Sequence, residues 1–405
     1  MARKSFKQAN VQFLSLKFDG GLNYSQAPAN IKDNELTRAI NIIYNSQTGT
    51  PETRPGTSCC MAAKCDGDNP ILKGYYYEKS ASEKWHVAAC NGNLYYRSGT
   101  LLDAWTKIGA LNDNTTVPSF LTYNSKLLIA DGGTNIKRWD GTTYDSLSDG
   151  LSATALATIK GRVVANSSTS ADLVTLSGEY DETHWNTATE GAVALRAGYG
   201  DNMSVNCFAV FGDDLIISKR GDSEKRLYRL NVADATTTNW YVENLSDNNC
   251  AQNAHCMVSA FNNVYFVDTN GFKSIKGVTE YGDLQIDLIG SRVNTLFGSS
   301  TCDEIVYLPL YTAIWYLISD RVFCYHHIAD VDSENKPFIH HAFTDLIFNC
   351  GRIRSVYQAG DYVYLCGNDG YLYKMDDYLA TDATSPSASS AYSSVIKTKQ
   401  FPFFG

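Results

Sequence analysis

Two pairs of adjacent histidines are the residues in this sequence best suited to hold a metal ion. They are His326-His327 and His340-His341, and imidazole nitrogens are common ligands of transition metals. Successive side chains of a strand point to opposite faces, so each pair offers one ligand at most to a given site. Because the sequence shows no Asp, Glu or Cys in known proximity, we expect structural or surface histidines and no metal site.

The cysteines are a second candidate. Eleven are present, and Cys59, Cys60 and Cys65 form the tightest group. Zinc sites usually contain a Cys-x-x-Cys pair, and the sequence has none. Several others (Cys90, Cys207, Cys324 and Cys366) lie in or beside apolar runs typical of strands. We therefore expect thiols that pack as small apolar side chains.

Asp66-Gly67-Asp68-Asn69 begins like a calcium-binding loop. Pro70 and Ile71 follow, however, and the sixth position of such a loop requires glycine. We predict a turn without a bound ion.

Paired carboxylates would suit a glycosidase, because many propeller glycosidases place acids around their central channel. The candidates are Asp145, Asp181, Glu182, Asp213 and Asp214. The Ser-x-Asp-x-Gly-x-x-Trp box of sialidase-like enzymes is absent, and aspartates in turns mostly bond their own backbone. The sequence also lacks a Gly-x-Ser-x-Gly elbow, a Gly-Lys-Ser/Thr loop and a His-Glu-x-x-His motif. We predict no enzyme, catalytic residue or cofactor. A protein that binds or cleaves glycans stays open as an alternative.

The elements that would position these residues are short strands joined by Gly, Asn or Asp turns. Residues 84–90 and 93–97 flank Asn91-Gly92, the strongest short hairpin signal. Six similar hairpins follow at 120–129, 155–164, 207–217, 257–266, 314–325 and 355–365. Their spacing is centred on ~40–50 residues, the length of one propeller blade. The sequence therefore predicts an all-β protein, a β-propeller with six or seven blades; a pair of β-sandwiches is the alternative.

Length and local composition suggest how the domains are organised. The chain has 405 residues, of which 44% are hydrophobic and 26 are tyrosines, enough apolar material for a large core rich in β-structure. We expect an extended N-terminal arm over residues 1–56, with one short helix at 33–39, and the propeller over 57–380. Residues 381–405 would be a linker and a C-terminal strand. That strand, at 394–399, either pairs with residues 11–18 to complete a blade or leads into further sequence.

Charge limits the possible partners. Lys and Arg number 34 and Asp and Glu number 43, giving a net charge of −9, which argues against a surface that wraps nucleic acid. It does not exclude a conduit through which DNA slides. The basic groups, Arg3, Lys4 and Lys7 and then Lys219-Arg220 with Lys225-Arg226, are predicted to be solvated. No signal peptide or membrane-spanning segment is visible, because the longest charge-free apolar stretch, residues 305–319, is short and contains Pro309.

The N-terminal arm carries an ordered set of motifs. They are Phe18-Asp19-Gly20-Gly21-Leu22-Asn23, Pro28, Ile31-Lys32-Asp33-Asn34-Glu35-Leu36, Ala39-x-Asn41 and Gly49-x-Pro-Glu-x-Arg54-Pro55-Gly56. Later landmarks lie at 179–186, 211–217, 266–272, 370–376 and 398–401. Together this order resembles the β-propeller tail-hub or tail-nozzle proteins of tailed bacteriophages, which include the packaged-DNA stabilisation proteins of short-tailed phages.

The resemblance implies a structural virion protein. Copies would form a homo-oligomeric ring, expected to be a hexamer, at the head-tail connector below the portal. The ring would contact the portal or adaptor and other tail proteins, extend the DNA channel without sequence-specific binding, and help to retain packaged DNA until ejection. It would be assembled in the host bacterial cytoplasm and reside in the virion tail. An intracellular interaction scaffold is a further alternative.

Overall fold

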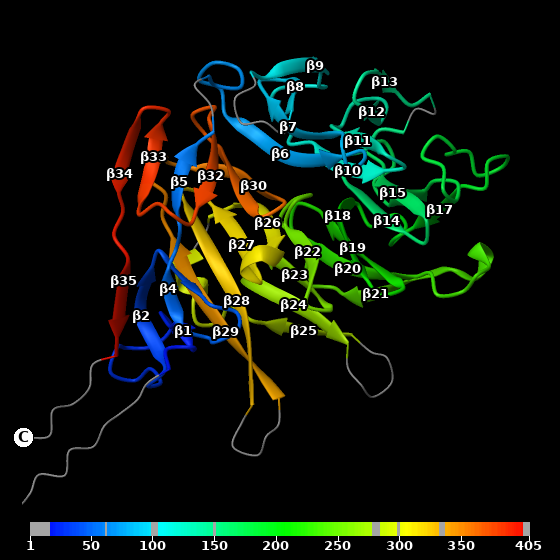
Figure 1. The fold of residues 1–405 in the computed structure, drawn as a ribbon. Coiled ribbons are helices and arrows are strands. Elements are labelled where there is room, and N and C mark those ends of the chain that lie inside the picture. The colour runs from blue at the N-terminus through cyan, green and yellow to red at the C-terminus, as the bar shows by residue number, and fades with distance from the viewer. Residues whose placement is uncertain are drawn as a thin grey trace, which may run out of the picture.

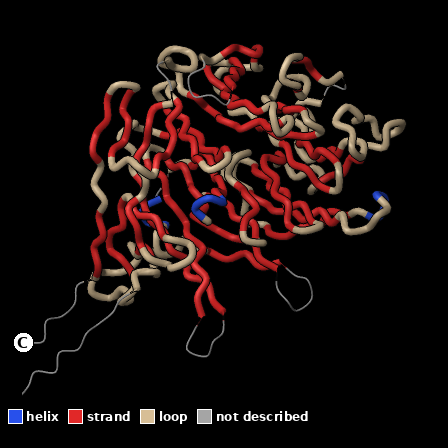
Figure 2. The backbone as a smooth tube through the Cα atoms, in the orientation of Figure 1, coloured by secondary structure: helices blue, strands red, loops and turns tan. Residues whose placement is uncertain are grey.

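The computed structural model describes residues 17–60, 63–98, 104–148, 151–277, 284–297, 300–331 and 337–399. Strands dominate these residues (Figure 2), and the described helices are single turns. They are η1 (Thr237–Asn239), α1 (Asn294–Phe297) and η2 (Pro309–Tyr311). No described helix has the length and apolar character needed to cross a membrane.

Five four-stranded sheets follow one another along the chain, and within each sheet neighbouring strands are antiparallel. Blade 1 consists of β6 (Ile71–Glu78), β7 (Lys84–Cys90), β8 (Asn93–Ser98) and β9 (Thr106–Ala110). Blade 2 consists of β10 (Ser119–Tyr123), β11 (Lys126–Ala130), β12 (Lys137–Trp139) and β13 (Tyr144–Ser146). Blade 3 consists of β14 (Leu156–Ile159), β15 (Arg162–Asn166), β16 (Leu173–Leu176) and β17 (Val193–Arg196). Blade 4 consists of β18 (Ser204–Phe211), β19 (Asp214–Arg220), β20 (Lys225–Asn231) and β21 (Tyr241–Ser246). Blade 5 consists of β22 (Met257–Ala260), β23 (Asn263–Asp268), β24 (Gly271–Gly277) and β25 (Leu284–Leu288).

The last two blades recruit strands from both ends of the chain. Blade 6 consists of β26 (Cys302–Leu308), β27 (Ala313–Ile318), β28 (Arg321–Val331) and β29 (Pro337–Leu346), and its sheet continues into β2 (Glu35–Ile40), β1 (Gly21–Leu22) and β35 (Val395–Thr398). Blade 7 consists of β30 (Ile353–Ala359), β31 (Tyr362–Gly367), β32 (Leu372–Asp376) and β5 (Gly56–Cys59), and its sheet continues into β33 (Thr381–Ser385) and β34 (Ala388–Ala391). A separate hairpin joins β3 (Ile42–Tyr44) to β4 (Pro51–Thr53).

The seven sheets close into a ring. The first strands of successive blades contact one another in the cycle β6, β10, β14, β18, β22, β26, β30 and back to β6, and Figure 1 shows them around a common centre. The predicted β-propeller is therefore confirmed, with seven blades in the described part of the chain. The two-sandwich alternative is wrong, because sandwiches would not place seven first strands around one axis.

Apolar side chains fill the wedges between blades. Tyr77, Trp85 and Trp139 pack together between blades 1 and 2, with ring centroids 5.2 to 5.5 Å apart. Where β6 meets blade 7 the approach is closer still. A Cβ on Gly74 would lie 2.4 Å from the Sγ atom of Cys366 and 2.5 Å from the ring of Tyr357. A residue without a side chain is therefore needed there.

The hairpin turns follow the sequence signals. Asn91 and Gly92 have φ angles of 48° and 68°, the left-handed pair that a type I′ turn requires. Two of the seven predicted hairpins, 84–97 and 314–325, join the second and third strands of their blades, whereas the other five join the first and second. This offset explains why the spacing of the hairpins is irregular.

Two expectations about the chain ends are wrong, and a third, the pairing of the C-terminal strand with residues 11–18, stays a prediction. Residues 35–40 form strand β2 rather than a helix, because β2 pairs with strands on both sides. The expected linker at 381–391 contains the hairpin of β33 and β34. The C-terminal strand β35 pairs with β2, and it is β5 that completes blade 7. Residues 11–16, part of the expected partner strand, lie outside the described residues.

Candidate functional site

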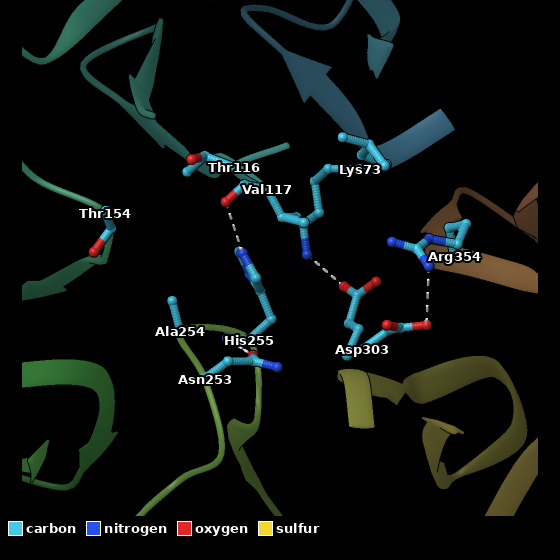
Figure 3. Close-up of a pocket in the computed structure, with 11 residues that line it drawn as sticks. Lys73, Thr116, Val117, Thr154, Asn253, Ala254, His255, Asp303 and Arg354 are labelled. Carbon is cyan, nitrogen blue, oxygen red and sulfur yellow. Dashed lines mark hydrogen bonds and ion pairs between the residues drawn. The ribbon is translucent and has the colours of Figure 1, made fainter. Parts of the chain in front are cut away.

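A cavity of about 240 Å³ opens on the propeller axis, at the end where the first strands begin. Its lining comes from blades 1, 2, 5, 6 and 7 and from the segment that leads into blade 3 (Figure 3). Propellers often bind ligands at such an axial opening, where loops from many blades converge. This cavity is the candidate functional site.

Ion pairs dominate one wall of the cavity. Lys73 Nζ lies 2.5 Å from Glu304 Oε1, which joins β6 to β26. Arg352 donates to both carboxylate oxygens of Asp303, at 2.7 and 3.0 Å. Arg354 Nη1 lies 3.8 Å from Asp303 as well (Figure 3). Three cations therefore face two carboxylates, and the pairs tie blades 1, 6 and 7 together.

The opposite wall is bridged by a histidine. His255 Nε2 lies 3.1 Å from the carbonyl oxygen of Val117, and since a carbonyl can only accept, that nitrogen carries the hydrogen. Burial and the positive charge of Lys73 lower the pKa of His255 to about 3, so the ring is neutral. His255 precedes blade 5 and Val117 precedes blade 2, across the ring from each other. At this level the two segments approach each other to hydrogen-bond distance across the axis.

The threonine hydroxyls of the cavity already have partners, whereas the buried Nε of Arg354 has none among the described residues. The hydroxyl of Thr116 donates to Asp113 at 2.7 Å, and that of Thr154 accepts from Asn166 at 3.0 Å. General acid or base catalysis needs a titratable group whose proton is available near neutral pH. The described groups here are paired ions, a neutral histidine and bonded hydroxyls. These contacts join the blades around the axis.

The histidine pairs divide between faces, as predicted from strand geometry. His326 is buried and its Nε2 lies 3.1 Å from the Thr344 hydroxyl oxygen. His327 stacks on Phe261 with ring centroids 4.2 Å apart. His341 Nδ1 lies 2.7 Å from the hydroxyl of Tyr325. These three rings therefore have packing or hydrogen-bonding roles, and His340 lies apart from them beside Asp19 and Asp330.

The eleven cysteines form no disulfide, and ten of them are buried. Cys60, Cys65, Cys90 and Cys366 belong to one apolar cluster between blades 7 and 1. Burial raises the pKa of Cys60 to about 12 despite the nearby positive charge of Arg97. The expectation that these thiols pack as small apolar side chains is confirmed.

The expected turn at Asp66 is also confirmed. Asp66 accepts hydrogen bonds from the Tyr95 hydroxyl at 2.9 Å and from Asn91 at 3.1 Å. Asp68 is largely exposed and pairs with Lys64. The two carboxylates therefore serve different partners.

Two of the carboxylates considered for glycan cleavage share one arginine. Arg138 binds Asp145 through two hydrogen bonds of 2.7 and 3.0 Å, and its Nη1 lies 3.5 Å from Glu182. Burial raises the pKa of Glu182, but hydrogen bonds from Lys126 and Asn124 outweigh this and hold the pKa below its usual range. A general acid requires the opposite shift.

The other three carboxylates lie in turns or ion pairs. A hydrogen bond from the Thr183 hydroxyl lowers the pKa of Asp181. Asp213 pairs with Lys160 at 2.7 Å, and Asp214 pairs with Arg229 at 2.8 Å. The five carboxylates therefore do not assemble into an acid–base pair within the described residues.

The basic cluster in blade 4 is less solvated than predicted. Lys219 is fully buried, and its Nζ lies 2.6 Å from Asp201 and within hydrogen-bond distance of two backbone carbonyls. Arg226 contacts Asp201 and Asp247. The predicted solvated face is wrong for Lys219, since its charge is neutralised inside the blade. Arg3, Lys4 and Lys7 lie outside the described residues.

A second polar centre, around Arg54, uses residues from the arm motifs. The guanidinium of Arg54 has no exposed surface and binds both oxygens of Asp382, at 2.6 and 2.9 Å. It also donates to Asn41 Oδ1 at 3.0 Å. Above and below it lie the rings of Phe348 and Tyr392, at 4.3 and 3.9 Å. Arg54 thus joins the arm to the chain that links blades 6 and 7 and to the C-terminal strands.

The axial residues gave no sequence signal. Lys73 and Glu304 are 231 positions apart, and each is an isolated charge at the start of a strand. Arg54, Asn41 and Glu35, by contrast, lie within the arm motifs, and all three are buried. The polar residues of the arm motifs were the sequence signal that could have indicated this centre, although the motifs alone did not reveal the partners of these residues.

Solved structures of similar fold are β-propellers. YCF48 bound to D1 peptide matches with a TM-score of 0.51 and 12% identity, over 84% of this chain and 99% of that chain. The extracellular domain of the putative one component system BT4673 from B. thetaiotaomicron has a TM-score of 0.51 and 8% identity, over 83% of this chain and 41% of that chain. The WD40 β-propeller domain of Doa1 has a TM-score of 0.47 and 14% identity, over 79% and 96%. At these identities the likeness shows the fold alone. No protein-family model and no curated protein sequence matches the chain.

Proposed function

We propose that this chain is a structural subunit of a bacteriophage tail, a hub or nozzle component that forms a ring below the portal and helps to retain packaged DNA until ejection. That the chain is a β-propeller, a fold consistent with scaffold roles, rests on its sheet topology and on the solved structures of similar fold. The proposed role in a phage tail rests on the arm motifs and on the contacts that their residues make in the fold.

The observation that carries the proposal is the layer built by the two chain ends. Strands β1, β2, β33, β34 and β35 extend blades 6 and 7 and lie together on one side of the propeller (Figure 1). We call these five strands the flange. Arg54 and Asp382 fix the flange through buried polar contacts. A ring subunit needs such a rigid lateral surface, because a closed ring requires the same heterologous contact at every interface.

Exposed apolar side chains on and beside the flange provide material for that contact. Tyr378 is 98% exposed, and Leu379 and Ile396 are 37% and 41% exposed. Tyr and other large apolar residues are typical of the centres of protein interfaces. We place part of the subunit contact at these three residues.

The DNA channel would lie between copies rather than within one. Within a single propeller the contact between His255 and Val117 crosses the axis. A ring of acidic subunits leaves a central opening whose walls bind phosphate weakly, since Lys and Arg contacts are what strengthen such binding. The excess of 43 acidic over 34 basic residues supports this part of the proposal.

Assembly with the portal tests the proposal. The full-length chain is mixed with the portal protein encoded in the same genome and imaged by cryo-electron microscopy. We expect a ring of propellers below the portal. Ile396→Asp and Tyr378→Ser should weaken the ring, whereas Tyr199→Ser, at an 81% exposed tyrosine between blades 3 and 4, should not. Monomers under all conditions, together with virion tails that lack this propeller, would overturn the proposal.

A further inference from the structure

The cavity on the propeller axis contains a cation without a hydrogen-bonded partner. Arg354, from β30, lines this cavity and points into it (Figure 3). Its ion-pair contact, between Nη1 and Asp303 Oδ2, is 3.8 Å long, beyond the range of a hydrogen bond. Its Nε atom is buried and has no hydrogen-bond partner among the described residues. Such an unpartnered group calls for an explanation, and an unseen water or ion is a common one.

The neighbouring charges are already paired with one another. Arg352 donates to both oxygens of Asp303, at 2.7 and 3.0 Å. Lys73 Nζ lies 2.5 Å from Glu304 Oε1, and Glu304 Oε2 accepts from a backbone N–H at 3.2 Å. Each carboxylate is therefore matched by one cation, and the charge of Arg354 is left over. Three cations less two carboxylates give this wall a net charge of +1.

Burial makes the unmatched charge of Arg354 costly. Desolvation lowers the pKa of its guanidinium, and the attraction of Asp303 offsets this only in part. The group stays protonated, because arginine is not deprotonated in proteins. An anion in the cavity would offset the cost of burying the charge. The whole chain carries a net charge of −9, so an anion would be attracted by this wall and not by the protein as a whole.

The size and the other walls of the cavity limit which anion fits. At ~30 Å³ for each water molecule, a volume of about 240 Å³ holds roughly eight waters. It is smaller than the ~300–1,000 Å³ of pockets for drug-sized ligands. Leu72, Val117 and Ala254 also line the cavity, so apolar surface lies close to the charge. These features favour a small anion that has an apolar part.

We propose that the cavity on the axis binds a small organic carboxylate, and that Arg354 pairs with its carboxylate group. The fork of a guanidinium matches the two oxygens of a carboxylate, and the apolar part of the acid would pack on Val117 and Ala254. The bound acid would touch several blades at once and so stabilise the closed propeller. This site goes beyond the proposed tail role and does not depend on it, since the proposed ring contact lies on the flange.

Calorimetric titration of the isolated full-length chain with simple acids tests this site. We expect propionate or benzoate to bind saturably, with one equivalent per chain, and the matching neutral amide, propionamide or benzamide, to bind at least ~10-fold more weakly. Inorganic phosphate should not displace the acid. At a hundredfold excess over Kd the acid should raise the Tm by about 3 °C. No saturable binding of either acid, equal binding of the amide, or displacement by phosphate would overturn the proposal.

Variants then locate the bound acid. Arg354→Gln should weaken its binding by about 10- to 150-fold, because a hydrogen-bonded charge is lost. Ala254→Leu, which fills part of the cavity and keeps Arg354, should also weaken binding and serves if Arg354→Gln fails to fold. Arg138→Gln is the matched control, since the Arg138 side chain is 23% exposed and that of Arg354 is 21% exposed. Wild-type affinity in either cavity variant, or loss of binding in Arg138→Gln, would contradict the assignment.

Discussion

Removing the charge of Asp382 should release the flange from the propeller. In Asp382→Ala the Arg54 guanidinium keeps three of its five hydrogen bonds, those to Asn41, Pro55 and Ile347, but loses the bidentate pair at 2.6 and 2.9 Å. Leaving one buried charge without its partner costs about 3–5 kcal/mol. That is a large part of the stability of a typical domain, ~5–15 kcal/mol.

We expect Asp382→Ala to loosen the flange at lower free-energy cost than it unfolds the whole propeller. Asp382 belongs to β33, and the blades themselves close through β5 and the inner strands. We therefore expect hydrogen exchange in residues 380–399 to accelerate strongly in Asp382→Ala, while exchange in the strands around the axis changes little. Urea unfolding would report the global cost and mass spectrometry of exchanged peptides the local one.

A partly exposed ion pair with the same bidentate geometry separates the effect of burial on stability from the effect of geometry. Arg138 binds Asp145 with the same bidentate pattern, but the two side chains are 23% and 40% exposed. Asp145→Ala should cost about 0.2–1 kcal/mol. In the double variant Arg54→Met/Asp382→Leu, most of the lost stability should return, because no unpaired charge remains. If Asp382→Ala cost no more than Asp145→Ala, the reasoning that burial makes the Arg54 pair strong would be refuted.

Three further predictions concern the blades. Gly74→Ala should lower stability by about 1–3 kcal/mol in chemical denaturation, because its Cβ has no space, whereas Gly277→Ala, with its nearest neighbour at 3.6 Å, should be tolerated; equal losses would contradict this. Burial lowers the pKa of His326 from 6.5 to about 3, so the unfolded chain takes up a proton as the pH falls below 6.5 while the folded chain does not. His326 alone should therefore lower stability by about 2 kcal/mol between pH 7 and 5, in addition to the similar losses from His86 and His255. His326→Gln should make the Tm-against-pH curve less steep over that range, and an unchanged slope would argue against a neutral buried ring. Cys59 is the one cysteine that is not buried, so a thiol reagent should label a single site rapidly in the native protein and Cys59→Ser should abolish it; several fast sites would show that the blades open readily.

The blade hairpins could be predicted from the sequence because their signals are local. A two-residue turn such as Asn91-Gly92 fixes the direction of both flanking strands through its own φ angles. Repetition of that signal then leads to a propeller. The contact between Lys73 and Glu304 could not be predicted this way, since only closure of the ring brings their strands together.

The secondary structure of the chain ends was predicted wrongly because it also depends on contacts between residues that are distant in the sequence. Glu35 accepts a hydrogen bond from the backbone N–H of Lys32 at 2.9 Å, a local contact that resembles the start of a helix, yet pairing with distant β35 makes the segment a strand. The Ala- and Ser-rich residues 381–391 have weak strand propensity. Asp382 and its bond to Arg54 hold them in place, and composition gives no sign of that partner.

Blade 7 has a consequence for the order of folding. Cys59 of β5 lies opposite Tyr373 of β32, so closing the ring joins positions about 310 residues apart and costs roughly 5 kcal/mol of chain entropy, from (3/2)RT ln n. During synthesis β5 emerges early and must wait, unpaired, until nearly the whole chain has left the ribosome. Nascent chains that end before β32 would hold an open ring with bare strand edges, a form prone to aggregation. The full chain would cross that entropy barrier once, during folding, and the closed ring would then open slowly.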